Sequence, residues 1–334
     1  MTLPHLPATF RAYEFEQHGN PLEVIRLNPS VPQPPLQPTE VRIRVHSAAL
    51  NPVNLKIIEF GPKMKYPQTQ GDPPYRIGFD VAGRVVEVGS DVTKFQAGEA
   101  VFGMAERGKA GSFAEFVNVD VKFLSRKPRN LSFNEAAGLA LAGETSYQGI
   151  VDHGRVKAGD RVLILGGSSG TGVFAVQIAK ARGAFVIATT SSRNVELVKS
   201  LGADQVVDYT REQWGDVLEA HSVDAIYDCG VEPESWNTQA QRVLVKGTGR
   251  FVSIIPIPDA IESPIGATAV PMYLDRNAEG LERLTELAEN GQLVVPIDSV
   301  HLFENLLDAV RVQRSQRARG KVVLQVLSEP EPSN

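Results

Sequence analysis

The sequence has little cysteine, no long apolar run and no block of charge of one sign. Its one cysteine, Cys229, excludes an internal disulfide and any metal site with several thiolates. No apolar run approaches the ~20 residues of a membrane-spanning helix, and the start of the chain has neither a signal-peptide nor a transit pattern. The basic residues are scattered and the formal net charge is -5, which gives no footprint for nucleic acid. We expect a cytoplasmic protein with no membrane span and no nucleic-acid partner.

The composition is that of a soluble globular protein, with 42% hydrophobic and 22% charged residues. A domain usually has roughly 100–200 residues, so 334 residues suggest two domains. Over residues 1–130, short strand signals cut by Gly and Pro indicate a largely β domain. One of these strands, VRIRVHSA, leads into ALNPVNLK (49–56), which we interpret as a Pro-stiffened turn.

From about Asn134 onwards, strand and helix signals alternate. Five strand-like segments are RVLIL (161–165), FVIAT (185–189), QVVDY (205–209), AIYDC (225–229) and RFVSII (250–255). The helix-compatible segments between them are VFAVQIAKAR, NVELVKSL, REQWGDVLEA and ESWNTQAQRVL. Such alternation predicts a parallel sheet with helices on both faces. After about Pro271, two helices separated by a short PID turn and the strand KVVLQV are too few for a third domain, so they should complete the first.

A glycine-rich turn, GGSSGTG (166–172), joins strand 161–165 to a helix. Glycines there allow a tight turn and close approach to a pyrophosphate at a helix N-terminus. Two frames fit: Gly170, Gly172 and Ala175 give GxGxxA, whereas Gly167 to Gly172 gives the same outline with Ser169 at the middle glycine. An ordinary turn is the alternative, but the four further strands favour a cofactor site. No Gly-Lys-Ser/Thr follows, which excludes a Walker loop, and no Tyr has a Lys four positions on, which argues against a short-chain dehydrogenase.

The expected nicotinamide cofactor is NADPH. An NAD site normally has an acid about 20 residues past the glycines, to hold the ribose 2′-hydroxyl. Here the segment reads TTSSRN (189–194) and contains no acid. Ser191, Ser192 and Arg193 could instead bind a 2′-phosphate. An alternative role for Ser192 is to cap the helix NVELVKSL.

These motifs resemble the zinc-independent quinone oxidoreductases (zeta-crystallin-like) of the medium-chain dehydrogenase/reductase family, from about Arg11 to Val326. The segments that carry the resemblance are ALNPVNLK (49–56), GFDVAGRVVEVG (78–89), GEAVFG (98–103), GSFAEF (111–116), LAGETSYQG (141–149), the glycine turn, KSLGADQVVDY (199–209) and RARGKVVL (317–324). The resemblance implies an α/β fold: a GroES-like β-rich catalytic domain, residues 1–132 and 272–334, and a Rossmann doubly wound parallel-sheet domain, residues 133–271.

The resemblance also implies the site residues. The expected cofactor contacts are Gly167, Ser168, Ser169, Gly170, Thr171, Gly172, Ser191, Ser192, Arg193, Tyr209 and Ile254. Asn51 and Lys56 would be catalytic and face a cleft between the domains, although Asn51 could be only a turn residue before Pro52 and Lys56 a solvated charge. Asn54 replaces an Asp common in the family, which puts a proton-relay role there in doubt.

Metal ligands of the zinc alcohol dehydrogenases are missing from this chain. Those relatives place a Cys in the first motif and Gly-His-Glu in the second, where this chain has Asn51 and Gly78-Phe79-Asp80. We therefore expect no metal, and hydride transfer from NADPH to a quinone or similar α,β-unsaturated carbonyl, which already accepts hydride well. The alternatives are a 2-enoyl thioester or enone reductase, and a non-enzymatic NADPH-binding protein of the crystallin-like or RNA-associated kind. The resemblance implies a homodimer joined through the Rossmann domains, and the strand near 267–273, which would otherwise leave an unpaired edge, favours it.

Overall fold

The computed structural model describes residues 6–63, 72–106 and 111–328. Contacts divide the chain into two compact units. Unit 1 comprises Met1–Leu141, Arg276–Glu289 and Ile297–Asn334, and unit 2 comprises Ala142–Asp275 and Asn290–Pro296. No helix in the described ranges combines the length and apolar character needed to cross a bilayer.

Unit 2 is built on a six-stranded parallel sheet in the order β11-β10-β9-β12-β13-β14. Its strands are β9 (Arg161–Leu165), β10 (Phe185–Thr190), β11 (Gln205–Asp208), β12 (Ala225–Asp228), β13 (Arg250–Ser253) and β14 (Thr268–Pro271). Strands β10 and β11 follow β9 on one side, and β12, β13 and β14 lie on its other side. The direction in which strands are added therefore reverses between β9 and β12. Ligands of doubly wound sheets bind at the carboxyl ends of the strands beside such a reversal. The glycine turn directly follows β9, so it lies at that place.

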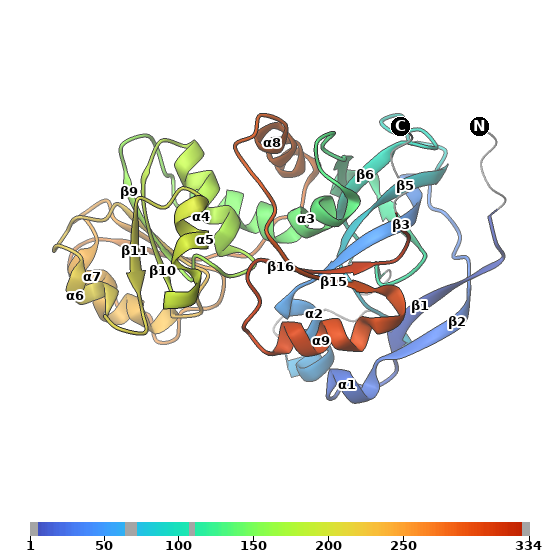
Figure 1. Ribbon diagram of the computed structural model, residues 1–334, viewed down its shortest axis with the longest axis horizontal. Coiled ribbons are helices and arrows are strands. Elements are labelled where there is room, and N and C mark those ends of the chain that lie inside the picture. The colour runs from blue at the N-terminus through green and yellow to red at the C-terminus, as the bar shows by residue number, and fades with distance from the viewer. Residues whose placement is uncertain (1–5, 64–71, 107–110, 329–334) are drawn as a thin grey trace. The chain divides into compact units, whose positions relative to one another are not determined.

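Helices cover both faces of this sheet, as expected (Figure 1). The helices of this unit are α4 (Gly172–Ala181), α5 (Val195–Ser200), α6 (Trp214–Val217) and α7 (Gln239–Val243), with 3-10 turns η4 (Ser192–Asn194) and η5 (Pro233–Asn237) and, before β9, a π-helical stretch (Gln148–His153). Helix α3 (Phe133–Tyr147) begins in unit 1 and ends in unit 2. Side chains alternate along a strand. Leu163 and Leu165 therefore pack on one face with Trp214 and Trp236, whereas α4 packs against the other.

Unit 1 contains a seven-stranded sheet, ordered β15-β16-β3-β5-β6-β8 with β7 also paired to β3, and a three-stranded sheet, ordered β2-β1-β4. The strands are β1 (Thr9–Phe15), β2 (Arg26–Pro32), β3 (Glu40–Leu50), β4 (Tyr75–Arg76), β5 (Asp80–Val88), β6 (Ala100–Met104), β7 (Phe116–Asp120), β8 (Leu124–Arg126), β15 (Ile297–Leu302) and β16 (Lys321–Gln325). The long strand β3 pairs with β7 over its first half and with β16 over its last residues. Two register shifts opposite β5 bend it between these partners.

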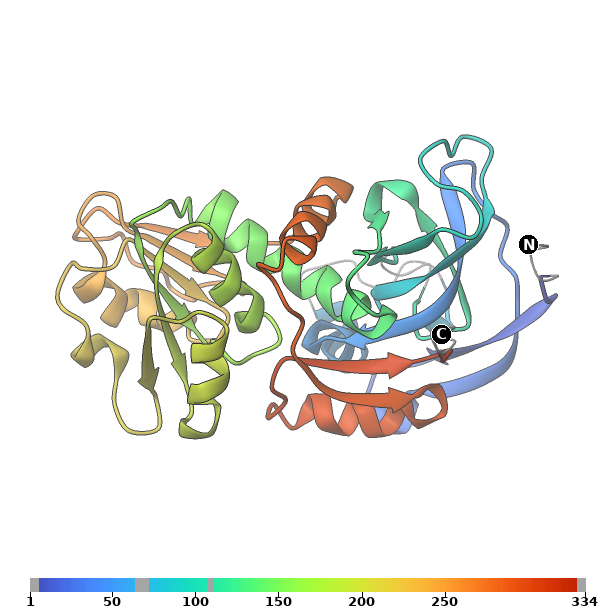
Figure 2. The same ribbon diagram turned by 45° about the horizontal axis from the view of Figure 1, so that its top comes forward.

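The C-terminal segment of unit 1 adds two strands and a helix to the N-terminal sheet. Strand β16 runs antiparallel to β3 with Val322 opposite Leu50, and Figure 2 shows β15 and β16 in red beside α9 (Leu306–Arg314). Leu306 and Val310 of α9 lie in a core cluster with Phe15 and Leu55. The other helical elements of this unit are α1 (Pro21–Val24), α2 (Pro52–Phe60), α8 (Ala278–Glu289), η1 (Gly61–Lys63), η2 (Val121–Phe123) and η6 (Phe303–Asn305).

Three local predictions were wrong. The turn expected at ALNPVNLK opens helix α2, with Pro52 at its first position, where a missing N–H has no cost. Of the helix expected at REQWGDVLEA, only Trp214–Val217 is helical; it contains Gly215, which has low helix propensity and lies against the Gln239 side chain. The PID turn begins strand β15, whose half-buried, alternating pattern makes a weak strand signal.

Candidate functional site

The glycine turn is tied to the neighbouring strand β10 by backbone hydrogen bonds. Gly166 has φ +78°, a conformation that favours glycine, and its N–H donates to Thr189 Oγ1 at 2.9 Å. The Gly167 N–H donates to the Thr189 carbonyl at 2.8 Å, and the Ser169 N–H donates to the Gly166 carbonyl at 2.9 Å. The turn therefore has a defined shape at the carboxyl end of β9.

The contacts of Gly172 favour one of the two possible frames. A Cβ on Gly172 would lie 2.1 Å from the Gly166 carbonyl oxygen, so only glycine fits there. This close approach of helix to strand is the role of the third glycine in the dinucleotide pattern. The frame Gly167-Ser169-Gly172 is therefore favoured, and Ser169 Oγ accepts the Gly172 N–H at 2.9 Å. In the described part of the chain, no acceptor takes the N–H groups of Gly170 and Thr171, which precede α4.

Ser168 connects the turn to the loop after β10. Its Oγ accepts hydrogen bonds from Thr190 Oγ1 at 2.8 Å and from Asn194 Nδ2 at 3.0 Å. Asn194 is buried, and it also begins α5 as its N-cap residue. Sequence reasoning missed Thr190 and Asn194; their position in TTSSRN was the available signal.

The loop expected to hold the 2′-phosphate contains Ser191 before η4 and Ser192 and Arg193 within it. The Ser192 hydroxyl donates to the carboxylate of Asp208, at the end of β11, so the alternative that Ser192 caps the following helix is wrong. Thr210 Oγ1 donates to the same carboxylate at 2.6 Å. Hydrogen bonds from Ser192 and Thr210 lower the pKa of Asp208, so this group is an anion at neutral pH.

Asp208 is an acidic residue beside the loop 189–194, which contains no Asp or Glu. The sequence reading missed it because it considered only residues 189–194, whereas Asp208 comes from the adjacent parallel strand, where it pairs with Thr190. Tyr209, the expected contact at the adenosine end, directly follows Asp208 and is exposed.

The ends of β12 and β13 complete this edge of the sheet. Asp228 is fully buried, accepts the Ser253 hydroxyl at 2.9 Å, and has its pKa raised by burial. The Cys229 thiol is buried and donates to the Leu165 carbonyl at 3.0 Å; burial raises its pKa far above the usual range, as for an unreactive thiol. Ile254, the remaining candidate contact, follows β13 and is half-buried; its N–H donates to the Asp228 carbonyl at 3.2 Å.

In unit 1, Asn51 belongs to a buried polar cluster that the sequence did not reveal. Its Nδ2 donates to Asp80 Oδ2 at 2.9 Å, and its Oδ1 accepts from Lys321 Nζ at 2.5 Å. Lys321 Nζ lies 3.5 Å from Asp80 Oδ2, and Asp80 Oδ1 accepts the Leu141 N–H at 2.8 Å. The side chains of Lys321 and Asp80 are 2% and 0% exposed, so this is an ion pair removed from water.

Burial and pairing act in opposite directions on the two charges. Burial raises the pKa of Asp80, whereas the Lys321 ammonium and the Asn51 amide lower it. Burial lowers the pKa of Lys321, and Asp80 opposes that shift. Both oxygens of Asp80 accept hydrogen bonds, which is the arrangement of an ionised carboxylate. The cluster therefore holds one negative and one positive charge.

Asn54 and Lys56 lie on α2, which begins after Asn51. Asn54 is buried; its Oδ1 accepts the Asn51 N–H at 2.8 Å, while its Nδ2 is a buried donor with no hydrogen-bond partner in the described structure. Lys56 is exposed. The structure thus places Asn51 and Lys56 in different surroundings, one inside the unit and one in solvent.

The residues that the resemblance matches to zinc ligands do not fit a metal. The described residues contain no group of three or more His, Cys, Asp or Glu side chains able to hold one. At the matched positions, the Asn51 oxygen already accepts from an ammonium and Asp80 is paired with that same ammonium. A cation there would have to displace the buried charge of Lys321.

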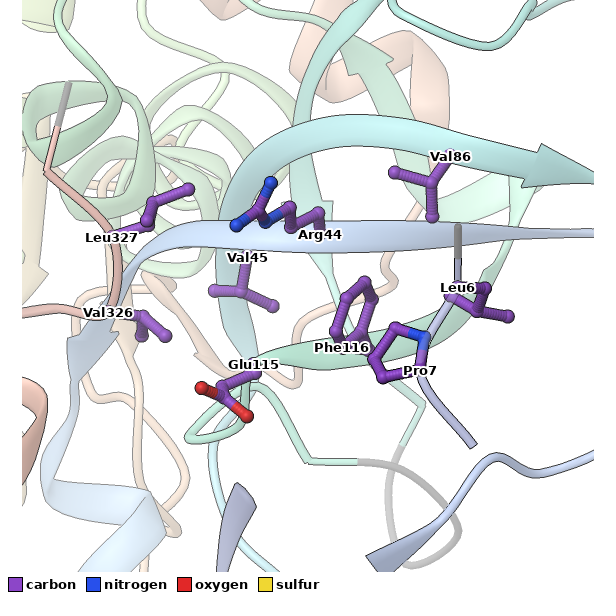
Figure 3. A pocket seen from close by; sticks show the side chains of 9 residues that line it. All are labelled: Leu6, Pro7, Arg44, Val45, Val86, Glu115, Phe116, Val326 and Leu327. Atoms are coloured by element: carbon purple, nitrogen blue, oxygen red, sulfur yellow. The ribbon is translucent and has the colours of Figure 1, made fainter. Parts of the chain in front are cut away.

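One surface pocket of unit 1 lies apart from these residues (Figure 3). Its volume is about 320 Å³. It is lined by Leu6, Pro7, Arg44, Val45, Val86, Glu115, Phe116, Val326 and Leu327, none of which is a candidate site residue. This pocket is therefore not supported as the place where the substrate reacts.

Two family models match this chain, one in its N-terminal part and one in its C-terminal part. Residues 37–129 match a family model described as an alcohol dehydrogenase GroES-like domain, and residues 201–324 match one described as a zinc-binding dehydrogenase. The chain is 35% identical over 329 residues to the 2-methylene-furan-3-one reductase of Solanum lycopersicum, with 96% of this chain and 80% of the relative covered. It is 33% identical over 334 residues to the chloroplastic NADPH-dependent alkenal/one oxidoreductase of Arabidopsis thaliana, with 96% and 80% covered.

A solved structure agrees with these relatives. The quinone oxidoreductase from Coxiella burnetii has a TM-score of 0.84 and 31% identity to this chain, with 95% of this chain and 99% of that one covered. The expected pair of folds, GroES-like and Rossmann, is confirmed. The chain therefore belongs to the medium-chain dehydrogenase/reductase family and is an oxidoreductase of the quinone-reductase type.

Proposed function

We propose that this protein is an NADPH-dependent, zinc-independent reductase of quinones or similar α,β-unsaturated carbonyl compounds. The observation that carries the proposal is the buried Asn51 amide, which lies in the motif where the zinc relatives place a metal-binding Cys and is held by hydrogen bonds with Asp80 and Lys321. A site with a fixed amide donor and no Lewis acid suits an acceptor that is already electrophilic. Asn51 would donate to the acceptor oxygen as negative charge develops there. The relatives named above are a reductase and an oxidoreductase, which argues against a non-enzymatic NADPH-binding protein.

The cofactor part of the proposal rests on unit 2. Bound NADPH would supply the hydride. The free N–H groups of Gly170 and Thr171 at the start of α4 suit a pyrophosphate, and Ser191 and Arg193 suit a 2′-phosphate. We propose that residues 133–271 form the cofactor-binding domain.

The second candidate is a reductase specific for enones or enoyl thioesters. Two of the relatives, at 35% and 33% identity, are named for enone or alkenal reduction, which favours an enone over a quinone as the natural acceptor. Turnover numbers for matched quinones, enones, enals and enoyl thioesters would rank these classes.

The first test is a screen of NADPH oxidation over these four acceptor classes. Turnover of at least one class, lost in Asn51→Ala by roughly 10²-fold in kcat with NADPH affinity retained, is the expected result. Lys56→Ala is the matched comparison, because Lys56 lies on the same segment but is exposed; its loss should be smaller. Absence of NADPH oxidation with every class would refute the proposal. Stoichiometric zinc in the purified protein, removed by chelation together with activity, would refute the zinc-independent mechanism.

A further inference from the structure

The cluster of Asn51, Asp80 and Lys321 is an expensive arrangement for a purely structural role. Burying an ammonium and a carboxylate costs several kcal/mol per ion, and apolar side chains of similar volume often stabilise a fold as well or better. The three residues come from three separate places: the link between β3 and α2, the start of β5 and the start of β16. In a simple ion pair the Lys321 ammonium would lie closest to the Asp80 carboxylate, but here it lies closest to the Asn51 amide oxygen. Lys321 Nζ is 2.5 Å from the Asn51 amide oxygen but 3.5 Å from Asp80.

These contacts use the Asn51 amide almost completely. The oxygen accepts from Lys321, and one hydrogen of Nδ2 is taken by Asp80, which leaves the second Nδ2 hydrogen. Asp80 is itself held through its other oxygen by the Leu141 N–H. The amide therefore has one orientation, in which oxygen and nitrogen cannot exchange places without putting an NH₂ group against the ammonium.

We propose that Lys321 is a positioning residue that acts through Asn51: its ammonium fixes the amide and draws electron density toward the amide oxygen, which makes the remaining N–H a stronger donor. A charged donor strengthens the hydrogen bond to that oxygen, and hydrogen bonds in a chain polarise one another. The inference rests on the proposed function, because it names the donor that meets the acceptor oxygen. Lys321 would keep its proton, because bound NADPH would supply the hydride and water the proton.

A double-mutant cycle between Lys321 and Asn51 tests this directly. The measured quantity is the single-turnover rate of hydride transfer from NADPH to a weak enone acceptor in Lys321→Met, Asn51→Ala and the double variant. We expect Lys321→Met to slow transfer about tenfold in the wild-type background, less than loss of a whole donor, and to have almost no further effect in Asn51→Ala. Lys321→Arg should recover part of the rate, and the Kd of NADPH should change less than twofold in all variants.

The reactivity of the acceptor gives a signature that a structural role would not produce. A reactive quinone needs little help at its oxygen, so the Lys321→Met loss should be smaller with the quinone than with the enone. Arg42→Met is the matched control: Arg42 is a buried cation in the half of β3 that pairs with β7 and is bonded to Asn118, whereas Asn51 follows the other end of the strand, which pairs with β16. That variant should lower Tm but leave the transfer rate unchanged. If Lys321→Met does not fold, the cycle is run with Lys321→Met/Asp80→Asn, which removes both charges together.

Two failures are distinguishable. If the wild-type protein oxidises NADPH with none of the acceptors, the proposed function fails. If it turns over but Lys321→Met keeps the wild-type rate, or slows Asn51→Ala as much as it slows the wild type, the inference about Lys321 is overturned and the proposed function stands.

Discussion

The burial of His46 predicts that unit 1 loses stability in mild acid. His46 lies in β3, is 5% exposed, and stacks on Phe133 with ring centroids 4.1 Å apart. Burial, together with the positive charges of Arg84 and Arg44, lowers its pKa from 6.5 to about 4. The folded protein therefore prefers the neutral ring.

The sign and size of the effect follow from this shift. Below the unfolded pKa of 6.5 the unfolded chain binds a proton that the folded chain does not, until the pH reaches the folded pKa of about 4. Stability from this group is thus complete above pH 6.5 and is lost as the pH falls through this window. The loss is ~2 kcal/mol at about pH 5 and reaches ~3 kcal/mol below the folded pKa.

The measurement is urea unfolding of the wild type and of His46→Phe at about pH 7 and about pH 5, followed by far-ultraviolet circular dichroism. Phe keeps the aromatic stack but cannot titrate, so His46→Phe should lose ~2 kcal/mol less than the wild type between the two pH values. Both tryptophans, Trp214 and Trp236, lie in unit 2, so their fluorescence reports that unit separately. Arg84→Met should shrink the wild-type loss, because it removes a cation that repels protonated His46. Equal pH dependence in wild type and His46→Phe would refute the reasoning.

Three further predictions concern the cofactor site and assembly. Arg193→Ala should weaken NADPH binding by roughly 1–3 kcal/mol and NADH binding far less, whereas Asp208→Asn should raise the preference for NADPH a few-fold by removing a nearby negative charge. Fluorescence titration measures both affinities, and equal losses for NADPH and NADH in Arg193→Ala would contradict the assignment of the 2′-phosphate site. Gly172→Ala should lower Tm and abolish binding of either cofactor, because its Cβ would meet the Gly166 carbonyl at 2.1 Å, and unchanged NADPH affinity would show that the turn is not the pyrophosphate site. We also propose a homodimer joined through the free edge of β14, the last strand of the unit 2 sheet; light scattering at micromolar concentration should give twice the chain mass, and a monomer mass would exclude it.

Features set by local chemistry could be predicted from the sequence alone. The strand-helix alternation of unit 2 and the five strands predicted between residues 161 and 255 were correctly placed, since hydrophobic period and turn residues are properties of neighbouring positions. The glycine turn was correctly located for the same reason, because its tight geometry requires glycine at Gly166 and Gly172. The strand β15 and the short helix α6 were not predicted correctly, because a half-exposed edge and one glycine weaken the local pattern.

Features that depend on distant pairing were decided only by the tertiary structure. Asn51 was a candidate from its motif, but the residues that hold its amide are 29 and 270 positions away, and no local pattern relates them. Asp208 comes close to Ser192 only because β10 and β11 are neighbours in the parallel sheet. The choice between the two glycine frames depended on how closely α4 approaches the end of β9. The sequence by itself determined the family and the cofactor turn, whereas the charges around the candidate donor and the candidate phosphate site came from strand pairing, which brings together residues that the chain keeps far apart.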